Sequence, residues 1–402
     1  MAPRLRSLVV LPVAVALLVT ACGTGEPRHT PPGGASTADD LIDIDQVPST
    51  ERENVPSALD DPAAGGLPAP IIDLDRLVSG GPPPDGIPAI DRPLFHAAGD
   101  VDFLDDREPV VAIEVDGDAR AYPVQILTWH EIVNDTVGGE PITISYCPLC
   151  NSAIAYDRRV GDRVLDFGTS GLLFNSALVM YDRQTESLWS HFTAEAVAGV
   201  LTGEELGRRP TALVAWSEWR SANPDGLVLS RSTGHRRDYG RNPYTGYDDI
   251  DQSPFLFDGE ADDRLRAMTR MVGINGGDDA VAVQLDALLE VGVLEASLAG
   301  RDLVVWALPG TASALDNSRI PDGRDVGTTG VFEAELDGRP LRFERVDEGF
   351  VDEQTGSLWN VLGEAVEGEL AGRQLTRVAH VDTFWFAWAA FLPDTEIIPP
   401  LE

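Results

Sequence analysis

The residues most able to do chemistry in this chain are Cys147 and Cys150, which form a Cys-Pro-Leu-Cys motif. The whole sequence has only three cysteines, and two of them lie in this motif. Alternating apolar residues at 142–146 and 154–156 flank the motif and predict two β-strands joined by a tight turn. Such a turn places both sulfurs on one side of the chain, where thiolates can bind a soft metal ion or exchange electrons as a dithiol and disulfide.

A metal site is the first interpretation of this pair. His130, in the segment Trp-His-Glu-Ile-Val-Asn-Asp, could supply a third ligand, and His191 could occupy a fourth position. Two thiolates with one imidazole suit zinc or copper(I). Glu131 and Asp135 are then the candidates to hydrogen-bond to the ligands and orient them. We therefore expect zinc or copper to bind to the two sulfurs and to His130.

Two other interpretations of the same pair stay open. In a thiol–disulfide oxidoreductase, Cys147 would attack a disulfide and Cys150 would resolve the mixed disulfide. In a non-enzymatic envelope module, the pair would form a permanent disulfide that closes a tight loop. Covalent haem is excluded, because Asn151 stands where the attachment motif needs histidine. The sequence alone does not decide whether the protein is an enzyme.

The charged residues exclude several other classes of function. All 30 basic residues are arginine, against 66 acidic residues, and the formal net charge is −36. Without lysine the chain has no Schiff-base amine and no P-loop lysine, so we expect no nucleotide cofactor. We also expect no nucleic acid as a partner, because phosphate binding needs clustered basic residues.

The N-terminus predicts export and lipid anchoring. Two arginines precede an apolar run at 8–19, which is long enough for the core of a signal peptide but short for a membrane span. The run ends in Leu-Val-Thr-Ala-Cys, which resembles the lipobox of bacterial lipoproteins, so residues 1–21 are expected to be removed and Cys22 to carry lipid. Residues 22–69 are rich in Pro, Gly and acidic residues and predict a disordered tether. The lipid would then hold the folded part at the cell envelope, outside the cytoplasm, with no protein partner indicated.

An internal duplication is the strongest indication of the fold. The segment 182–189, Asp-Arg-Gln-Thr-Glu-Ser-Leu-Trp, recurs at 352–359 as Asp-Glu-Gln-Thr-Gly-Ser-Leu-Trp. Short alternating runs between Gly, Asp and Pro turns predict β-hairpins, and apolar residues on one face of 211–222 predict a helix. We therefore expect an α+β, mainly β fold, in which two tandem degenerate repeats of a β-rich unit with a packed helix form one compact exported region.

The repeats divide the exported region into three parts. The first repeat, 70–233, carries the cysteine pair, a tyrosine-rich connector follows at 234–267, and the second, degenerate repeat spans 268–402. In the second repeat, Leu308 and Thr311 stand at the positions of the two cysteines, and the histidine-containing segment has no counterpart. The thiols are therefore dispensable for the fold, and their loss together with that segment favours a joint use of the two.

The same motifs resemble a bacterial family known as domain of unknown function 3179. The resemblance is carried by Asp85-Gly86-Ile87-Pro88, Ala119-Arg120-Ala121-Tyr122-Pro123, His130-Glu131-Ile132-Val133-Asn134-Asp135, Tyr146-Cys147-Pro148-Leu149-Cys150 and Met180-Tyr181-Asp182. It covers nearly the whole exported region and implies no settled activity. The chain departs from the family pattern at Asn151, which is usually glycine, and at His191, which is usually glutamine. The second departure means that the family does not imply a metal ligand at His191.

Overall fold

The computed structural model describes residues 41–277 and 279–398. The expected signal peptide, Cys22 and the first part of the expected tether lie outside the described residues. Everything described belongs to one unit, Ala38–Glu402, and it contains thirty β-strands but only four α-helices, each of seven residues. The mainly β fold is therefore confirmed. None of the described helices has the length and apolar character needed to cross a membrane.

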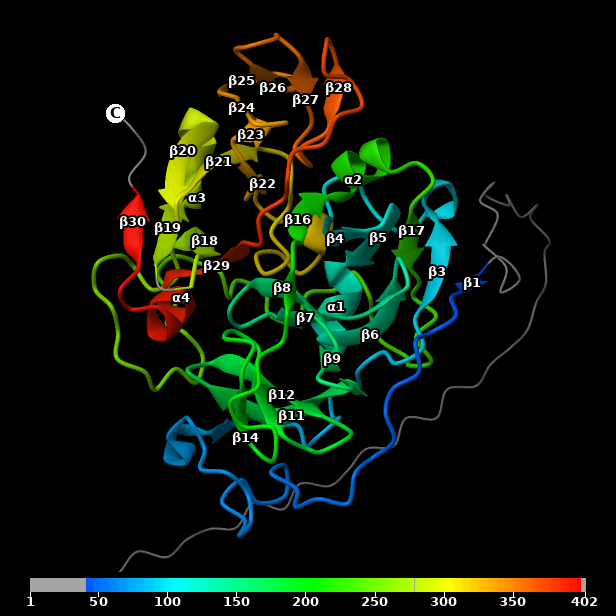
Figure 1. Ribbon diagram of the computed structural model, residues 1–402, viewed down its shortest axis with the longest axis vertical. Coiled ribbons are helices and arrows are strands. Elements are labelled where there is room, and N and C mark those ends of the chain that lie inside the picture. The colour runs from blue at the N-terminus through cyan, green and yellow to red at the C-terminus, as the bar shows by residue number, and fades with distance from the viewer. Residues whose placement is uncertain (1–40, 278, 399–402) are drawn as a thin grey trace, which may run out of the picture. The chain divides into compact units, whose positions relative to one another are not determined.

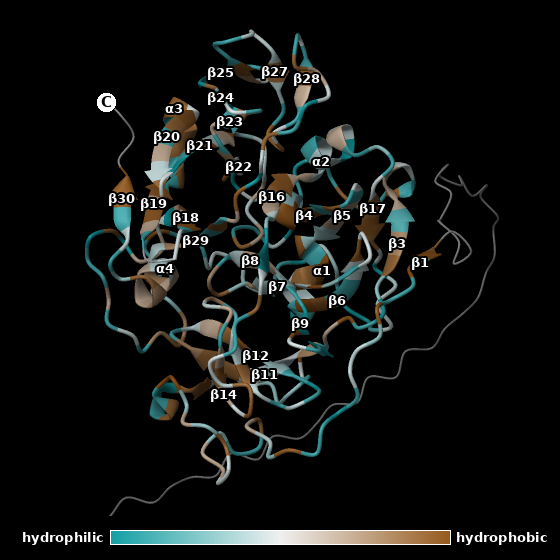
Figure 2. Ribbon diagram, viewed as in Figure 1, coloured by the Kyte–Doolittle hydropathy of each residue, from teal (hydrophilic) through white to brown (hydrophobic). Residues whose placement is uncertain are grey.

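The first sheet has six strands in the order β1-β3-β17-β5-β4-β16. The strands are β1 (Ile42–Asp43), β3 (Leu94–Ala97), β4 (Pro109–Val115), β5 (Asp118–Pro123), β16 (Ala212–Ala215) and β17 (Leu227–Leu229). β4 and β5 form an antiparallel hairpin, and β17 returns parallel to β5. Figure 2 shows β16 and β17 as largely apolar, and their side chains contribute to the buried core.

The second sheet contains the cysteine motif and has the order β15-β8-β7-β6. Its strands are β6 (Ile132–Val137), β7 (Glu140–Cys147), β8 (Ser152–Asp157) and β15 (Arg208–Arg209), and α1 (Val124–His130) links the first sheet to β6. β7 ends at Cys147 and β8 begins at Ser152, and the two strands pair in antiparallel register. The strand–turn–strand arrangement expected around the two cysteines is therefore confirmed.

A third sheet packs beside this turn in the order β14-β13-β12-β11-β2. Its strands are β2 (Val78–Ser79), β11 (Phe167–Phe174), β12 (Ala177–Asp182), β13 (Leu188–Ser190) and β14 (Ala196–Ala198), and a small hairpin joins β9 (Arg159–Val160) to β10 (Arg163–Val164). The β11–β12 turn holds Asn175 and Ser176 at φ of +51° and +65°. This left-handed turn suits a two-residue hairpin, and the carbonyl oxygen of Ser176 lies 3.8 Å from the Cys150 sulfur.

The second half of the chain builds a similar set of sheets. Their orders are β29-β18-β19-β30, β20-β21-β22 and β25-β26-β27-β28, with a separate β23-β24 hairpin. The strands are β18 (Arg270–Asn275), β19 (Ala280–Gln284), β20 (Val293–Leu298), β21 (Arg301–Leu308), β22 (Thr328–Glu333), β23 (Glu335–Leu336), β24 (Arg339–Pro340), β25 (Phe343–Val346), β26 (Gly349–Asp352), β27 (Leu358–Trp359), β28 (Ala365–Glu367), β29 (Val381–Phe384) and β30 (Glu396–Ile398). β30 runs parallel to β19 as β17 runs parallel to β5.

The helices also occupy matching places in the two halves. α3 (Leu285–Val291) follows β19 as α1 follows β5, and α4 (Trp385–Phe391) follows β29 as α2 (Trp216–Ala222) follows β16. The helix expected at 211–222 therefore begins only at Trp216. The preceding residues form β16 because their backbone groups pair with β4 along the edge of the first sheet, and this pairing overrides the helical pattern.

Residues 41–69 differ from the tether that their composition predicts. β1 pairs with β3, Glu53 forms an ion pair with Arg163 at 2.5 Å, and Ala58 is fully buried. Proline and acidic content describe the segment as a whole, whereas a few well-placed side chains are enough to attach it to the sheets. The segment is thus part of the folded region from residue 41 onward.

The two halves meet at β16 and β22 and also at the cysteine turn. β16 packs against β22 (Figure 1), and the N–H of Ala215 donates to Oγ1 of Thr328 at 3.3 Å. The carbonyl oxygen of Cys150 accepts two hydrogen bonds, one from the N–H of Phe384 at 3.0 Å and one from the hydroxyl of Thr383 at 2.9 Å. The second half therefore holds the backbone of the cysteine turn in place.

Candidate functional site

The two cysteines form a closely spaced, buried thiol pair. Their sulfurs lie 3.2 Å apart, both residues are free cysteines, and they are 1% and 0% exposed. The turn between β7 and β8 brings them together, and Asn151 closes it with φ of +53° and an N–H that donates to the carbonyl of Pro148 at 3.2 Å. Asparagine tolerates this left-handed conformation better than most residues, so it can replace the glycine expected there.

The two thiols have different acidities. Burial opposes ionisation of Cys147, but hydrogen bonds from the Cys150 thiol and from the backbone N–H groups of Leu178, Cys150 and Leu149 outweigh burial and lower its pKa. Burial and the neighbouring Cys147 raise the pKa of Cys150 well above its ordinary value. Cys147 is therefore the thiol that ionises first, as a nucleophile or a metal ligand requires.

Glu131 contributes an unusual carboxyl group to this pair. Burial, followed by the charge of Cys147, raises the pKa of Glu131 to about 8, and the side chain is only 7% exposed. The residue follows α1 as its C-cap, with φ of +59°. Its carbonyl oxygen accepts a hydrogen bond from the N–H of Tyr146 at 2.7 Å, which fixes its backbone next to the end of β7. A carboxyl group with this pKa can hold or release a proton near neutral pH.

His130 is turned toward other partners. Its Nδ1 donates to the carbonyl oxygen of Pro88 at 2.7 Å, and its Nε2 accepts from the hydroxyl of Tyr239 at 2.7 Å. Burial lowers the pKa of His130 to about 4, so the ring is neutral at neutral pH. Both ring nitrogens are thus engaged away from the sulfurs, and the structure does not bring this third expected ligand to the pair.

His191 and Asp135 are also engaged in buried networks of their own. The His191 ring lies between Ser145 and Ser152, with Nδ1 at 2.8 Å and Nε2 at 2.7 Å from the two hydroxyl oxygens. Asp135 binds the Arg120 guanidinium at 3.2 Å and accepts from the Tyr122 hydroxyl at 2.5 Å. Among residues 41–277 and 279–398, no three His, Cys, Asp or Glu side chains converge in a way that could hold a metal ion.

The tyrosine-rich connector, 234–267, supplies residues beside the cysteine turn that the sequence analysis did not place there. The hydroxyl of Tyr247 donates to the carbonyl oxygen of Leu149, between the two cysteines, at 3.1 Å. Burial raises the pKa of Tyr244 and of Tyr247, and the charge of Cys147 contributes to both shifts. Three tyrosines within nine residues, at 239, 244 and 247, were the available signal, but nothing in their spacing shows which face of the fold they cover.

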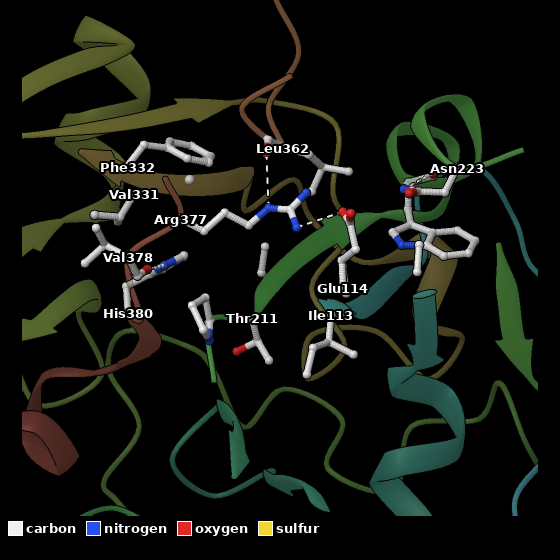
Figure 3. Close-up of a pocket in the computed structure, with 16 residues that line it drawn as sticks. Ile113, Glu114, Thr211, Asn223, Val331, Phe332, Leu362, Arg377, Val378 and His380 are labelled. Carbon is white, nitrogen blue, oxygen red and sulfur yellow. Dashed lines mark hydrogen bonds and ion pairs between the residues drawn. The ribbon is translucent and has the colours of Figure 1, made fainter. Parts of the chain in front are cut away.

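A cavity between the two halves is distinct from the cysteine site. Figure 3 shows Arg377 reaching across it toward Glu114, with Nη1 and Oε2 2.9 Å apart, and the His380 ring facing the same space. Apolar residues from both halves, including Ile113 and Phe332, form much of its wall. None of the described lining residues belongs to the cysteine turn, so we assign the cavity to the packing of the two halves.

Comparison with known proteins places the chain in a family but not in a functional class. No curated protein and no solved structure matches it. A family model described as protein of unknown function (DUF3179) matches residues 84–395, which is more than half of the chain and includes the cysteine pair, Glu131 and the connector. The chain therefore belongs to the DUF3179 family, as its motifs predict.

Proposed function

We propose that this protein is a lipid-anchored, extracytoplasmic thiol–disulfide oxidoreductase that uses Cys147 and Cys150. One observation carries the proposal: two sulfurs 3.2 Å apart, of which one has a lowered and one a raised pKa. In a pair with this asymmetry, the thiol with the lowered pKa acts as the nucleophile and the other as the resolving thiol. Glu131 supports the proposal because its carboxyl group can exchange a proton with the pair near neutral pH.

The exchange proceeds in two steps with a partner disulfide as the oxidant. The Cys147 thiolate attacks one sulfur, the partner S–S bond breaks, and the released partner thiolate takes up the proton of the Glu131 carboxyl group. The resulting Glu131 carboxylate accepts the proton of Cys150, whose thiolate attacks the Cys147 sulfur and breaks the mixed disulfide. The second partner thiolate leaves and takes up this proton from Glu131. The products are two partner thiols and one Cys147–Cys150 disulfide, so two electrons and two protons pass to the partner. A dithiol donor restores the reduced pair by the reverse sequence.

A zinc or copper site at the same pair is the second candidate function. The backbone N–H groups that stabilise the Cys147 sulfur would stabilise a metal-bound thiolate in the same way. To bind such an ion through Nε2, His130 would have to give up its hydrogen bond with Tyr239, whereas Nδ1 could keep donating to Pro88. We rank this candidate second because the histidine bonds are satisfied without a metal.

We further propose that the two halves arose by duplication. Asp182 accepts hydrogen bonds from Trp189, Thr185 and Ser187, and the same bonds in the second half join Asp352 to Trp359, Thr355 and Ser357. The shared strand order of the two halves agrees with this origin. The first repeat, with the cysteine turn, would then be the active one.

The test of the oxidoreductase uses the lipidated full-length protein in detergent, purified under reducing, chelator-free conditions. We expect a metal-free protein whose pair titrates reversibly between dithiol and disulfide in glutathione buffers. Cys147→Ser should abolish reduction of a peptide disulfide, whereas Cys150→Ser should accumulate a mixed disulfide through Cys147. One zinc or copper ion per chain, lost in both variants, would instead establish the second candidate. A disulfide that is reduced only on unfolding would leave a structural role.

A further inference from the structure

The connector presents an apolar surface beside the cysteine turn. Ile250, Phe255 and Leu256 are 39%, 52% and 39% exposed. They lie within seven residues of each other, yet they make up half of the six large hydrophobic side chains that stand exposed in the described structure. Clusters of exposed apolar side chains are typical of interaction sites. We call Ile250, Phe255 and Leu256 the connector patch.

The backbone under the connector patch is held firmly. The N–H of Phe255 donates to the hydroxyl of Tyr247 at 3.1 Å, and its carbonyl oxygen accepts from Ser176. The ring of Phe257 packs edge-on against Phe386, with centroids 5.3 Å apart. Leu256 has φ of +51°, a conformation that a bulky residue adopts only when its surroundings impose it. The patch is therefore exposed because the fold holds it outward.

A pocket connects the connector patch to the cysteine turn. Its lining includes Leu149, Tyr244, Tyr247 and Phe255. Leu149 is the residue between Pro148 and Cys150, so a chain that binds in this pocket contacts the turn that holds both sulfurs. Phe255 of the patch and Leu149 of the cysteine turn thus line the same pocket.

The charges around the connector patch indicate the character of the partner. Residues 248–263 contain seven acidic residues and no arginine. Asp251, Asp258 and Asp262 pair with nearby arginines, and Asp248 is buried against Arg270. Asp249, Glu260 and Asp263 make no ion pair with any other described residue, and Asp249 and Asp263 are exposed. An apolar surface with an acidic rim complements an apolar segment flanked by positive charge.

We infer that the connector patch docks an extended polypeptide segment of the partner, in which the exchanging cysteine stands beside an apolar side chain and is flanked by basic residues. The inference rests on the proposed oxidoreductase, since it names the class of substrate that reaches Cys147. An apolar side chain of the segment packs on Phe255 and Leu256, and its basic residues face the acidic rim. Docking of this kind carries the partner's sulfur to the turn that contains Leu149.

The test separates docking from redox chemistry. A Cys147→Ser, Cys150→Ser double variant of the lipidated protein cannot exchange thiols, so binding of a fluorescent Arg- and Leu-rich peptide with serine in place of cysteine reports docking alone. Fluorescence anisotropy should show saturable binding that weakens at least tenfold with Phe255→Ser or Leu256→Asn. Asparagine is chosen because it tolerates the left-handed backbone of position 256.

Matched controls make the result decisive. Val291→Ser and Val366→Ser change side chains that are 40% and 45% exposed elsewhere on the surface, and they should leave the affinity unchanged. A peptide with glutamate in place of arginine should bind at least tenfold more weakly. Equal affinity for the two peptides, or for the patch variants and the controls, would overturn the docking surface. Reduction of glutathione disulfide by the unmodified protein, measured in parallel, reports separately whether the redox proposal stands.

Discussion

The hydroxyl of Tyr247 donates a hydrogen bond to the carbonyl oxygen of Leu149 across 3.1 Å, and it accepts one from the N–H of Phe255 across 3.1 Å. One side chain of the connector thus bonds both to the cysteine turn and to the exposed apolar segment. Because the two sulfurs are 1% and 0% exposed, a reagent or partner reaches them only after a local movement. The Tyr247 bonds are among those that resist such a movement.

Tyr247→Phe should therefore make the thiols react faster. Loss of the bond to Leu149 removes about 1 kcal/mol from the closed state, which corresponds to a rise of about fivefold in the open population. The measurement is the rate of thiol alkylation under native conditions. Tyr181→Phe is the matched control, because the Tyr181 hydroxyl bonds instead to Asp85 at 2.6 Å. An unchanged rate in the Tyr247 variant would mean that the opening movement does not break this bond.

Glu131→Gln should change how stability depends on pH. The pKa of Glu131 is raised to about 8, mainly by burial, so the folded protein keeps a proton that the unfolded chain releases near its ordinary value of 4.5. Stability is then lost as pH rises from 4.5 through 8. Because glutamine cannot ionise, the free energy of unfolding of the variant at pH 9 should exceed that of the unmodified protein by up to about 5 kcal/mol.

The measurement for this variant is urea unfolding at pH 5 and pH 9. Glu205→Gln replaces an exposed carboxylate and should show the same pH dependence as the unmodified protein. If the free energy of unfolding of Glu131→Gln differs between pH 5 and pH 9 as much as that of the unmodified protein, the carboxyl group is not held in its protonated form. The same variant should also slow the second step of disulfide exchange, because Cys150 loses its proton acceptor.

The local part of the site could be predicted from the sequence, whereas the partners of the cysteines could not. Alternating residues on both sides of the motif predict β7, β8 and the turn between them, because strand pairing across a short turn is a local property. Thr383 and Tyr247 contact the turn from 233 and 98 residues away. Such contacts depend on how the second half and the connector pack, which no spacing within the motif reveals.

His130 also shows what residue spacing within a motif does not predict. Its position beside Glu131 in a family motif favours a joint role with the cysteines, but spacing does not determine where a side chain points. The residue is the last of α1, and its ring hydrogen-bonds to Pro88 and Tyr239, whereas the pKa of the next residue, Glu131, responds to the charge of Cys147. Adjacent residues at a helix end thus have different surroundings in the core.

His191→Gln should protect the fold in mild acid. Burial, followed by the charge of Arg208, lowers the pKa of His191 to about 3. The unfolded chain binds a proton near 6.5, so the folded state loses stability as pH falls from 6.5 toward 3. Glutamine does not titrate and can hydrogen-bond to both Ser145 and Ser152.

The measurement for His191→Gln is the urea midpoint between pH 7 and pH 4. Relative to the unmodified protein, the unfolding free energy of the variant should rise by up to about 3 kcal/mol between pH 7 and pH 4. His235→Gln is the control, because its side chain is exposed and should leave the acid sensitivity in place. Equal acid sensitivity of the two variants would show that a group other than His191 is responsible.

Asp182→Asn and Asp352→Asn compare one hydrogen-bond network in two settings. Both carboxylates accept only from donors, namely an indole, a hydroxyl and backbone N–H groups. An asparagine amide would direct N–H groups against some of these donors whichever way it is turned. Each variant should therefore lose about 2–4 kcal/mol of unfolding free energy.

The two losses should depend on pH with opposite sign. Burial raises the pKa of Asp182 despite its hydrogen bonds, whereas at Asp352 the bonds from Trp359 and Thr355 outweigh burial and lower the pKa. The penalty of Asp352→Asn should grow as pH rises through the ordinary aspartate value, and that of Asp182→Asn should shrink. Urea unfolding at pH 3.5, 5 and 7 measures both. If the stability losses of the two variants changed with pH in the same direction, the carboxylate of the first half would not be buried more deeply than that of the second. The two networks would then have no electrostatic difference.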